Sequence, residues 1–379
     1  MSQHFSSPPR LVLGEGALEQ LSKELRNLGT KVLVVTDPGI VAAGILAIVT
    51  NVLNDSGLDI DVFSDVVGNP DVSTVEAAEK ARSNSGADIL VAIGGGSSMD
   101  VAKSVAVVAT NGGSIADYEG VDKFTTTPLP VIAVPTTVGS GSEVTKGAVI
   151  TNPATHVKMV IVSDLMFAKI ALLDRRVVAG LPGRIAATTG MDALTHAIEA
   201  YVAKGANPVT DAINIGAIEI IGQNLVAASK GDEDALYQML VASSMAGIGF
   251  HDAGLGAVHA LANTLGAHFG VHHGTANALF LPYVMDFNVS SAPARFARIA
   301  RALGVDTTGL DDDQASLAAA AAVHQLAVDT GVPRKLSEVG VSEDAIETLA
   351  KDALVQADLP GNPREASLED LIDLYRKAL

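Results

Sequence analysis

The sequence predicts a protein of two parts: an α/β N-terminal dinucleotide-binding domain with a mostly parallel sheet, and an all-α C-terminal domain. In the first half, short apolar runs alternate with helical periods, which is the pattern of βαβ units. From about Leu181 the strand-like runs end and long Ala-rich helical periods take over. Since 379 residues suffice for two domains with sizeable cores, we expect domains at 1–181 and 182–379.

The strands of the first half are continuous apolar runs, as in a parallel sheet covered on both faces. One example is Lys31-Val-Leu-Val-Val-Thr36, which ends in the turn Asp37-Pro-Gly39. The expected strands are 11–13, 31–36, 59–63, 89–93 and 131–135. Between them, spacing of apolar residues at i, i+3 and i+4 predicts helices at 17–28, 41–55 and 72–83.

The second half contains helical periods separated by short polar turns such as Val332-Pro-Arg334. The expected helices are 185–203, 209–230, 233–250, 256–267, 275–288, 291–303, 312–330, 342–356 and 367–379.

Composition narrows the class of protein. A hydrophobic content of 48% with 18% charged residues is typical of a compact soluble enzyme. The formal charge of −18 without a basic stripe argues against a nucleic-acid partner. The absence of cysteine excludes disulfides, thiol nucleophiles and Cys-ligated zinc. Because we find neither a secretory h-region nor an uncharged apolar run long enough for a bilayer, we expect a cytoplasmic protein with no membrane partner.

Two strand ends carry residues suited to a nucleotide. Gly94-Gly-Gly-Ser-Ser-Met-Asp100 follows a strand and opens a helix, so backbone N–H groups could approach a pyrophosphate. A tight turn without a ligand explains the glycines equally well, and the run is not the G-x-G-x-x-G fingerprint. Asp37 could accept hydrogen bonds from a ribose hydroxyl, although a plain Asp-Pro-Gly turn is the simpler interpretation. The hydroxyl-rich loop that ends the run Val131–Glu143 suits a phosphate or a nicotinamide amide.

The helical half holds a candidate metal site. Asp192 and His196 are four residues apart on one predicted helix, so a carboxylate and an imidazole project from the same face. Such a pair alone is more often a surface or capping pair. However, five of the nine histidines fall between His251 and His273, and His259 and His273 join the first pair as candidates. One carboxylate and three imidazoles suit Fe(II) or Zn(II), with room for a substrate oxygen.

These motifs together resemble the iron-containing (group III) alcohol dehydrogenase family, and the resemblance spans nearly the whole chain. The residues that carry it are Gly94-Gly-Gly-Ser-Ser-Met-Asp-Val-Ala-Lys103, Val134-Pro-Thr-Thr-Val-Gly-Ser-Gly-Ser-Glu-Val-Thr145, Gly190-Met-Asp-Ala-Leu-Thr-His-Ala-Ile-Glu-Ala-Tyr201, Gly256-Ala-Val-His-Ala-Leu-Ala262, His273-Gly-Thr-Ala-Asn-Ala278 and Asn362-Pro-Arg364.

The resemblance implies NAD(H)-linked interconversion of a short-chain primary alcohol or diol and its aldehyde, with the active site in a cleft between the domains. It implies that the metal, Fe(II) with Zn(II) as an alternative, acts as a Lewis acid during hydride transfer. It also implies a homodimer or higher homo-oligomer. The implied metal ligands are Asp192, His196, His259 and His273. The implied cofactor contacts, with Asp37 favouring NAD(H) over NADP(H), are Asp37, Asn69, Gly95, Gly96, Ser97, Asp100, Thr136, Thr137, Ser140 and Lys158.

One position departs from the family pattern. Many relatives carry His-x-x-x-His after the third ligand, and their second histidine serves as a proton relay. This chain has His259-Ala-Leu-Ala-Asn263, and asparagine does not take up a proton at neutral pH. We expect His251 or solvent to complete the relay, unless the pocket is shaped for another substrate.

Two alternatives remain at this stage. Relatives of the dehydroquinate synthase and glycerol-1-phosphate dehydrogenase type share the plan but act on phosphorylated substrates, and the few Lys and Arg residues near the candidate ligands argue against them. A non-catalytic nucleotide-binding protein is opposed by the presence of all four candidate ligands.

Overall fold

The structure is a computed structural model that describes residues 5–6, 9–54, 57–153 and 157–379. The chain divides into two compact units, which we describe separately. The α/β unit comprises Ser6–Thr137 and Gly141–Ala179. The helical unit comprises Val138–Ser140 and Gly180–Leu379, together with Phe5.

The main sheet of the α/β unit has six strands, all parallel, in the order β1-β9-β6-β4-β2-β3. This confirms the predicted fold class of the first half, although the strand β9 was not predicted. The strands are β1 (Arg10–Leu13), β2 (Lys31–Val35), β3 (Asp59–Phe63), β4 (Ile89–Gly94), β6 (Val131–Pro135) and β9 (Ile170–Leu173).

The central strands are apolar throughout because helices remove both faces of the sheet from water. Every residue of β4 is buried, and Ile89, Val91 and Ile93 join one core cluster with Val32 and Val34 of β2. The helices of this unit are α1 (Leu21–Leu25), α2 (Pro38–Ala42), α3 (Ile45–Asn54), α4 (Val72–Ser85) and α5 (Gly96–Asn111).

The predicted helix 41–55 is two helices. Gly44, with a φ of +75°, separates α2 from α3, because this left-handed backbone interrupts the helical hydrogen bonds. Asp55, the predicted end, lies outside the described residues. The predicted helix 17–28 is also shorter, with a 3₁₀ turn at Leu18–Gln20 before α1.

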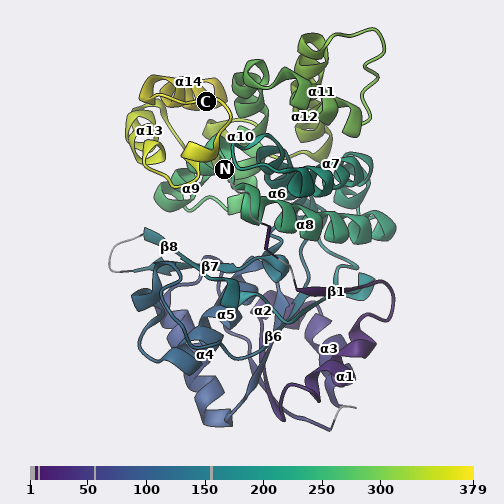
Figure 1. The fold of residues 1–379 in the computed structure, drawn as a ribbon, viewed down its shortest axis with the longest axis vertical. Coiled ribbons are helices and arrows are strands. Elements are labelled where there is room, and N and C mark those ends of the chain that lie inside the picture. The colour runs from purple at the N-terminus through teal and green to yellow at the C-terminus, as the bar shows by residue number, and fades with distance from the viewer. Residues whose placement is uncertain (1–4, 7–8, 55–56, 154–156) are drawn as a thin grey trace. The chain divides into compact units, whose positions relative to one another are not determined.

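A second, three-stranded sheet in this unit was not predicted. Its order is β5-β8-β7, and it contains β5 (Gly120–Val121), β7 (Gly147–Asn152) and β8 (Val157–Val162). Strands β7 and β8 form the antiparallel pair seen side by side in Figure 1. The bridge between Asp71 and Thr151 joins β7 to the segment before α4.

The strand order creates a topological switch between β2 and β4. The chain leaves β2 to form β3 on one side and then returns to place β4 on the other side. In parallel α/β sheets, ligands bind where the carboxyl ends of strands meet at such a point. The two ends that meet here lead into Asp37 and into the Gly94–Gly96 turn.

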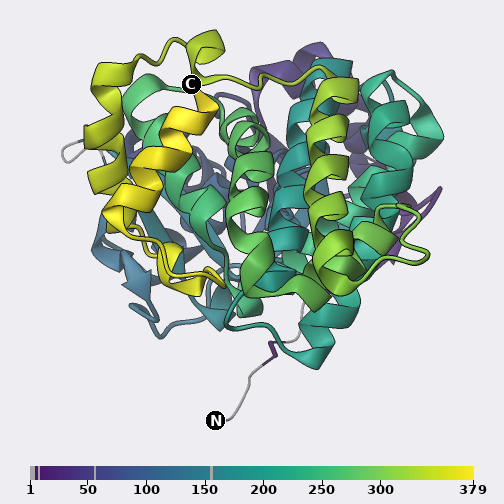
Figure 2. The same ribbon diagram turned by 90° about the horizontal axis from the view of Figure 1, so that it is seen from above.

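In the helical unit, the described residues from Gly183 onward form helices and no β-strand, as predicted. Helix α6 packs on α7, α8 and α10, while α9 packs on α10 and α13. Figures 1 and 2 show the yellow C-terminal helices α13 and α14 next to one another. The helices are α6 (Gly183–Val202), α7 (Pro208–Ser229), α8 (Glu233–Ala253), α9 (Ala257–Phe269), α10 (His273–Asn288), α11 (Pro293–Ala302), α12 (Asp312–Thr330), α13 (Ile346–Leu354) and α14 (Leu368–Ala378).

By length and composition alone, α7 is long and apolar enough to cross a membrane. In the structure it contacts α6, α8, α11 and α12, and Ile218, Ile221 and Leu225 are buried. A core helix passes the same test of length and composition, so this property is weak evidence for a membrane.

Candidate functional site

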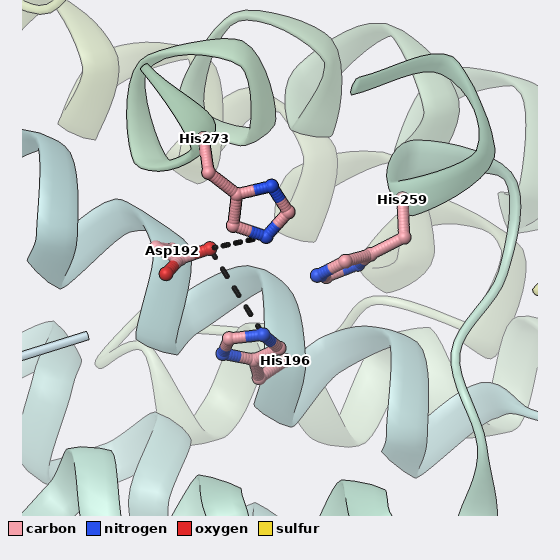
Figure 3. Close-up of side chains that lie close together, drawn as sticks. All are labelled: Asp192, His196, His259 and His273. Atoms are coloured by element: carbon pink, nitrogen blue, oxygen red, sulfur yellow. Dashed lines mark ion pairs between the residues drawn. The ribbon is translucent and has the colours of Figure 1, made fainter. Parts of the chain in front are cut away.

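The four candidate metal ligands converge in the helical unit (Figure 3). Helix α6 supplies Asp192 and His196, α9 supplies His259, and α10 begins at His273. One ligand atom from each lies within 4.8 Å of all the others, and Asp192 Oδ1 is 3.7 Å from His273 Nε2. Donors held about 2.1 Å from a tetrahedral ion are roughly 3.4 Å apart, so this spacing fits a metal centre with slight contraction.

Burial and charge prepare these donors for a cation. Asp192, His196 and His259 are buried, whereas the side chain of His273 is 33% exposed. Burial lowers the pKa of His196 to about 4, so its imidazole is neutral and has a free lone pair. Burial would raise the pKa of Asp192, but the three imidazoles and the Asn277 amide hold it below its ordinary value and keep the carboxylate ionised.

Two histidines have their outer ring nitrogens engaged by other groups. His196 Nδ1 lies 3.3 Å from the Gly139 carbonyl oxygen, and His259 Nδ1 lies 2.5 Å from Glu199 Oε2. Because both acceptors require a proton on Nδ1, Nε2 is the nitrogen of each ring that can bind a metal. Phe250 stacks on the His196 ring at a centroid distance of 4.4 Å and restrains it further.

Asn277 belongs to this cluster and was missed in the sequence. Its Nδ2 lies 2.6 Å from Asp192 Oδ1 and 3.1 Å from Nε2 of both His259 and His273. Its Oδ1 is buried and has no hydrogen-bond partner among the described residues. A buried polar atom of this kind fits a site that takes a further polar group or ion. The signals for Asn277 in the sequence were its four-residue spacing from His273 and its place in the motif His273–Ala278.

The structure does not bring the predicted relay residue His251 into the four-residue cluster. His251 lies in the last turn of α8, and its Nε2 is 3.0 Å from Asp252 Oδ1. Asn263 lies one turn after His259 on α9 and donates a 3.3 Å hydrogen bond from Nδ2 to Asp358. Burial, together with the nearby Glu199 charge, raises the pKa of Asp358.

In the α/β unit, the structure brings Asp37 against the glycine turn. Asp37 Oδ1 accepts hydrogen bonds from Gly39 N and Ile40 N and caps α2, while Oδ2 lies 3.5 Å from Ser98 Oγ. Gly94 has a φ of +149°, and a Cβ there would lie 2.8 Å from Ser98 Cβ. Asp37 therefore caps its own turn and also lies beside the glycine turn. The glycine turn continues into Gly95, Gly96 and Ser97 at the start of α5.

Asp100 and Lys158 interact through their opposite charges. Burial lowers the pKa of Lys158, and the Asp100 carboxylate partly offsets this effect. Asp100 accepts hydrogen bonds from Ser142 Oγ at 2.8 Å and from Val149 N at 3.1 Å. Asp100, a predicted cofactor contact, thus also holds the segment between β6 and β7. Lys103, one turn further on α5, was missed in the sequence and holds the same segment.

Lys103 is buried, and its ammonium donates to the carbonyl oxygens of Ser142, Thr145 and Gly147 at 2.5–3.0 Å. Burial lowers its pKa to about 8. A buried ammonium with three carbonyl acceptors is a structural clamp, and its position in the motif Gly94–Lys103 gave the only hint in the sequence.

The other predicted cofactor residues belong to different parts of the chain. Thr136 is buried, and its Oγ1 has no hydrogen-bond partner among the described residues, whereas Thr137 lies beside Gly95. Asn69 is exposed, has a φ of +53° and precedes the Asp71–Thr151 bridge, and Thr151 pairs with Lys158 across the β7–β8 hairpin. Ser140 belongs to the helical unit, together with Val138 and Gly139.

A parallel sheet with a nucleotide-type switch point and a carboxylate–histidine cluster are the features expected of a metal-dependent dehydrogenase. Two family descriptions match this chain: "Iron-containing alcohol dehydrogenase" over residues 8–175, and "Fe-containing alcohol dehydrogenase family, C-terminal" over residues 186–379. The chain is 40% identical over 368 residues to lactaldehyde reductase of Escherichia coli (strain K12), with 96% of each chain covered.

Solved structures agree with this assignment. The fold matches a 1,3-propanediol oxidoreductase with a TM-score of 0.98 at 36% identity, over 100% of both chains. It also matches a sulfoacetaldehyde reductase from Bifidobacterium kashiwanohense in complex with NAD⁺, with a TM-score of 0.90 at 32% identity, over 100% of this chain and 99% of that one. The chain belongs to the iron-containing alcohol dehydrogenase family, and it is an oxidoreductase of CH–OH groups. The phosphorylated-substrate and non-catalytic alternatives are not favoured.

Proposed function

We propose that this protein is a metal-dependent, NAD(H)-linked alcohol dehydrogenase that interconverts a short-chain primary alcohol or diol and its aldehyde. The observation that carries the proposal is the convergence of one carboxylate and three imidazoles from three helices, with one ligand atom from each within 4.8 Å of the others. In this role Asp192, His196, His259 and His273 hold Fe(II), or Zn(II), whose donor preferences this set satisfies.

When bound, the metal supplies Lewis-acid polarisation of the alcohol or carbonyl oxygen, and NAD(H) accepts or supplies the hydride. The protein's own residues hold and orient these groups. Gly139 and Glu199 fix the ring orientation of His196 and His259, so the donors need no rearrangement during turnover. Exposure of His273 marks the side of the cluster that a small substrate can reach.

We assign the cofactor to the α/β unit. The backbone N–H groups of Gly95, Gly96 and Ser97 at the start of α5 suit the pyrophosphate, and Asp37 suits a ribose hydroxyl. Asn69, Asp100, Thr136, Thr137, Ser140 and Lys158 complete the proposed contacts, and the buried hydroxyl of Thr136 has no hydrogen-bond partner among the described residues.

The proton released on alcohol oxidation needs a route. Asn263 does not accept it, so we retain His251 or solvent as the relay. The pH profile of kcat for alcohol oxidation by His251→Ala, compared with the wild type, tests this. We expect the limb that reports the relay base to shift or disappear. An unchanged profile and rate would remove His251 from the mechanism.

The function itself is tested by reconstituting the purified chain separately with Fe(II) and Zn(II) and following NADH formation. The panel contains short primary alcohols and diols, and the reverse reaction uses their aldehydes with NADH. We expect turnover that disappears in Asp192→Ala. No turnover in either direction with either metal would contradict the proposal.

We also propose that the protein acts as a homodimer or higher homo-oligomer in the cytoplasm, as small-molecule metabolism by a chain of this family requires no membrane or nucleic-acid partner. Light scattering of the purified protein tests the oligomeric state, and a single monomeric mass would contradict it.

A further inference from the structure

Helix α9, which carries His259, begins without a cap of its own. Its N-cap residue is Gly256, which has no side chain to accept a hydrogen bond from the first turn. Helices normally satisfy these first N–H groups locally, with Ser, Thr, Asp or Asn at the N-cap. Here two side chains from distant parts of the sequence do so: Ala257 N donates to Asn362 Oδ1 at 3.2 Å, and Val258 N donates to Glu199 Oε1 at 2.7 Å.

Glu199 makes a second contact that Asn362 does not make. Its other oxygen, Oε2, accepts a hydrogen bond from His259 Nδ1 at 2.5 Å, and both side chains are buried. One carboxylate therefore holds the start of the helix with one oxygen and the imidazole on the next residue with the other. In Figure 3, His259 reaches from its helix toward the other three candidate ligands, so the angle of this ring decides where its Nε2 points.

The fit around Gly256 is close. A Cβ at Gly256 would lie 2.8 Å from Asn362 Oδ1 and 3.1 Å from Glu199 Oε1, so the glycine permits both caps to approach. Asn362 is held in turn by reciprocal amide hydrogen bonds with Asn288 at 2.8 and 2.9 Å. This explains physically why the Asn362-Pro-Arg364 motif near the end of the chain accompanies the metal-site motifs.

Glu199 also shares its helix with two of the candidate ligands. It follows His196 by three residues on α6, so it projects close to the same face. Helix α6 thus offers two ligands directly and controls a third, on α9, through Glu199. Any displacement of α9 along α6 would break the bond to Val258 N and the bond to His259 together.

We propose that Glu199 is a positioning residue of the metal centre, which fixes His259 in the Nδ1–H tautomer and couples the ring to the capped start of α9. This inference rests on the proposed metal-dependent function. Asn362 shares the capping role only. Burial lowers the pKa of His259, while the charges of Glu199 and, to a smaller extent, Asp358 raise it. Among the described residues, the Asp358 side chain hydrogen-bonds to Asn263.

These distinctions define matched variants. Glu199→Gln keeps the size and one oxygen, so it can accept from Val258 or from His259 but not from both. Asn362→Ala removes a cap on α9 without touching His259. Asp358→Asn removes a neighbouring charge without removing a contact to the ring. Zn(II) affinity is measured for each by competition with a chromophoric chelator, and the visible spectrum of the Co(II)-loaded protein reports the ligand geometry.

We expect Glu199→Gln to weaken Zn(II) binding by about 10- to 100-fold and to alter the Co(II) spectrum, as loss of a metal ligand's hydrogen-bond partner does elsewhere. Asn362→Ala should lower the melting temperature but change Zn(II) affinity by less than about threefold, and Asp358→Asn should behave likewise in affinity. Equal affinity of Glu199→Gln and wild type would overturn the inference. So would an equal loss in Asp358→Asn, because charge rather than contact would then be responsible.

Two further measurements distinguish a wrong role for Glu199 from a wrong metal centre. If wild type and Asp192→Ala bind Zn(II) equally weakly, the proposed metal centre is wrong and the inference falls with it. Selective ¹⁵N-histidine NMR of Zn(II)-loaded wild type needs no variant and is expected to show His259 protonated at Nδ1. A signal from an Nε2–H tautomer of His259 would overturn the inference even if Glu199→Gln does not fold.

Discussion

The two units build their candidate binding sites from different parts of the chain. In the α/β unit, the proposed pyrophosphate contacts are backbone groups: the glycines after β4 lead into α5, whose first N–H groups have no side-chain cap. In the helical unit, the metal-type site is entirely side chains, each held by another group such as Glu199 or Gly139. Backbone sites depend on local conformation, whereas side-chain sites depend on tertiary contacts, so substitutions should affect the two differently.

The largest expected effect is at a metal ligand. Asp192→Ala removes the only carboxylate of the cluster, and the loss of several kcal/mol of charge stabilisation should lower kcat/KM by about 1,000-fold or more. NADH binding, followed by fluorescence titration, should not change, because the proposed cofactor contacts lie elsewhere. The exposed residue Glu219 on α7 provides a control, and Glu219→Gln should leave both quantities unaltered. Loss of NADH binding in Asp192→Ala would show that the two sites are not independent.

In the α/β unit, the buried side chain of Lys103 holds the segment from Ser142 to Gly147. Its pKa falls from 10.5 to about 8 on folding, so between these values the unfolded chain binds more protons than the folded one. Stability should therefore rise as pH increases from about 8 to 10.5, by about 3 kcal/mol from this group. In the wild type, the urea midpoint of unfolding should increase with pH across that range, and in Lys103→Met this increase should be absent.

The matched control for this experiment is Lys80→Met, which alters an exposed lysine on α4 in the same unit. It should retain the pH dependence of the wild type. If Lys103→Met retains it as well, the buried ammonium does not titrate in this window. The cage of the Ser142, Thr145 and Gly147 carbonyls would then hold the proton more firmly than burial weakens it.

The same difference explains what could be predicted from the sequence. Strands β2, β4 and β6 and the long helices α6–α10 follow from apolar periodicity, which is a local signal. The four candidate ligands were recognisable because Asp192 and His196 are four residues apart and because histidines are sparse elsewhere. The β5-β8-β7 sheet was missed although β7 and β8 have six residues each. Its third strand, β5, has only two residues, and these pair with residues of β8 far away in the chain.

The supporting residues could not be predicted in the same way. Glu199 reaches His259 across 60 residues, and Gly139 reaches His196 across 57 residues, so no spacing in the sequence marks either contact. Asn362 caps Ala257 across 105 residues. Such contacts exist only once the helices are packed, which is why a side-chain site is harder to read in a sequence than a glycine turn.

A direct test of the backbone site is Gly94→Ala. A φ of +149° is accessible only to glycine, and the added Cβ would lie 2.8 Å from Ser98 Cβ. We expect the dissociation constant for NADH to increase by about 30-fold, in line with 1–3 kcal/mol of strain, while Zn(II) affinity stays unchanged. Gly86→Ala is the control, because Gly86 has a φ of +70° with nothing within 4 Å of the added atom. Equal losses in both variants would mean that general destabilisation, rather than the shape of the turn, is measured.

The smallest expected effect concerns Asp37, whose side chain caps α2 and is also the proposed contact of a ribose hydroxyl. Asparagine is as good an N-cap as aspartate, so Asp37→Asn should preserve the hydrogen bonds from Gly39 N and Ile40 N and leave the melting temperature unchanged. It removes the charge that would repel a 2′-phosphate, and at close range one such repulsion is worth about a tenfold change. We therefore expect KM for NADP⁺ to fall by about tenfold and KM for NAD⁺ to rise modestly. An unchanged ratio of the two KM values would reduce Asp37 to a turn residue with no part in the choice of cofactor.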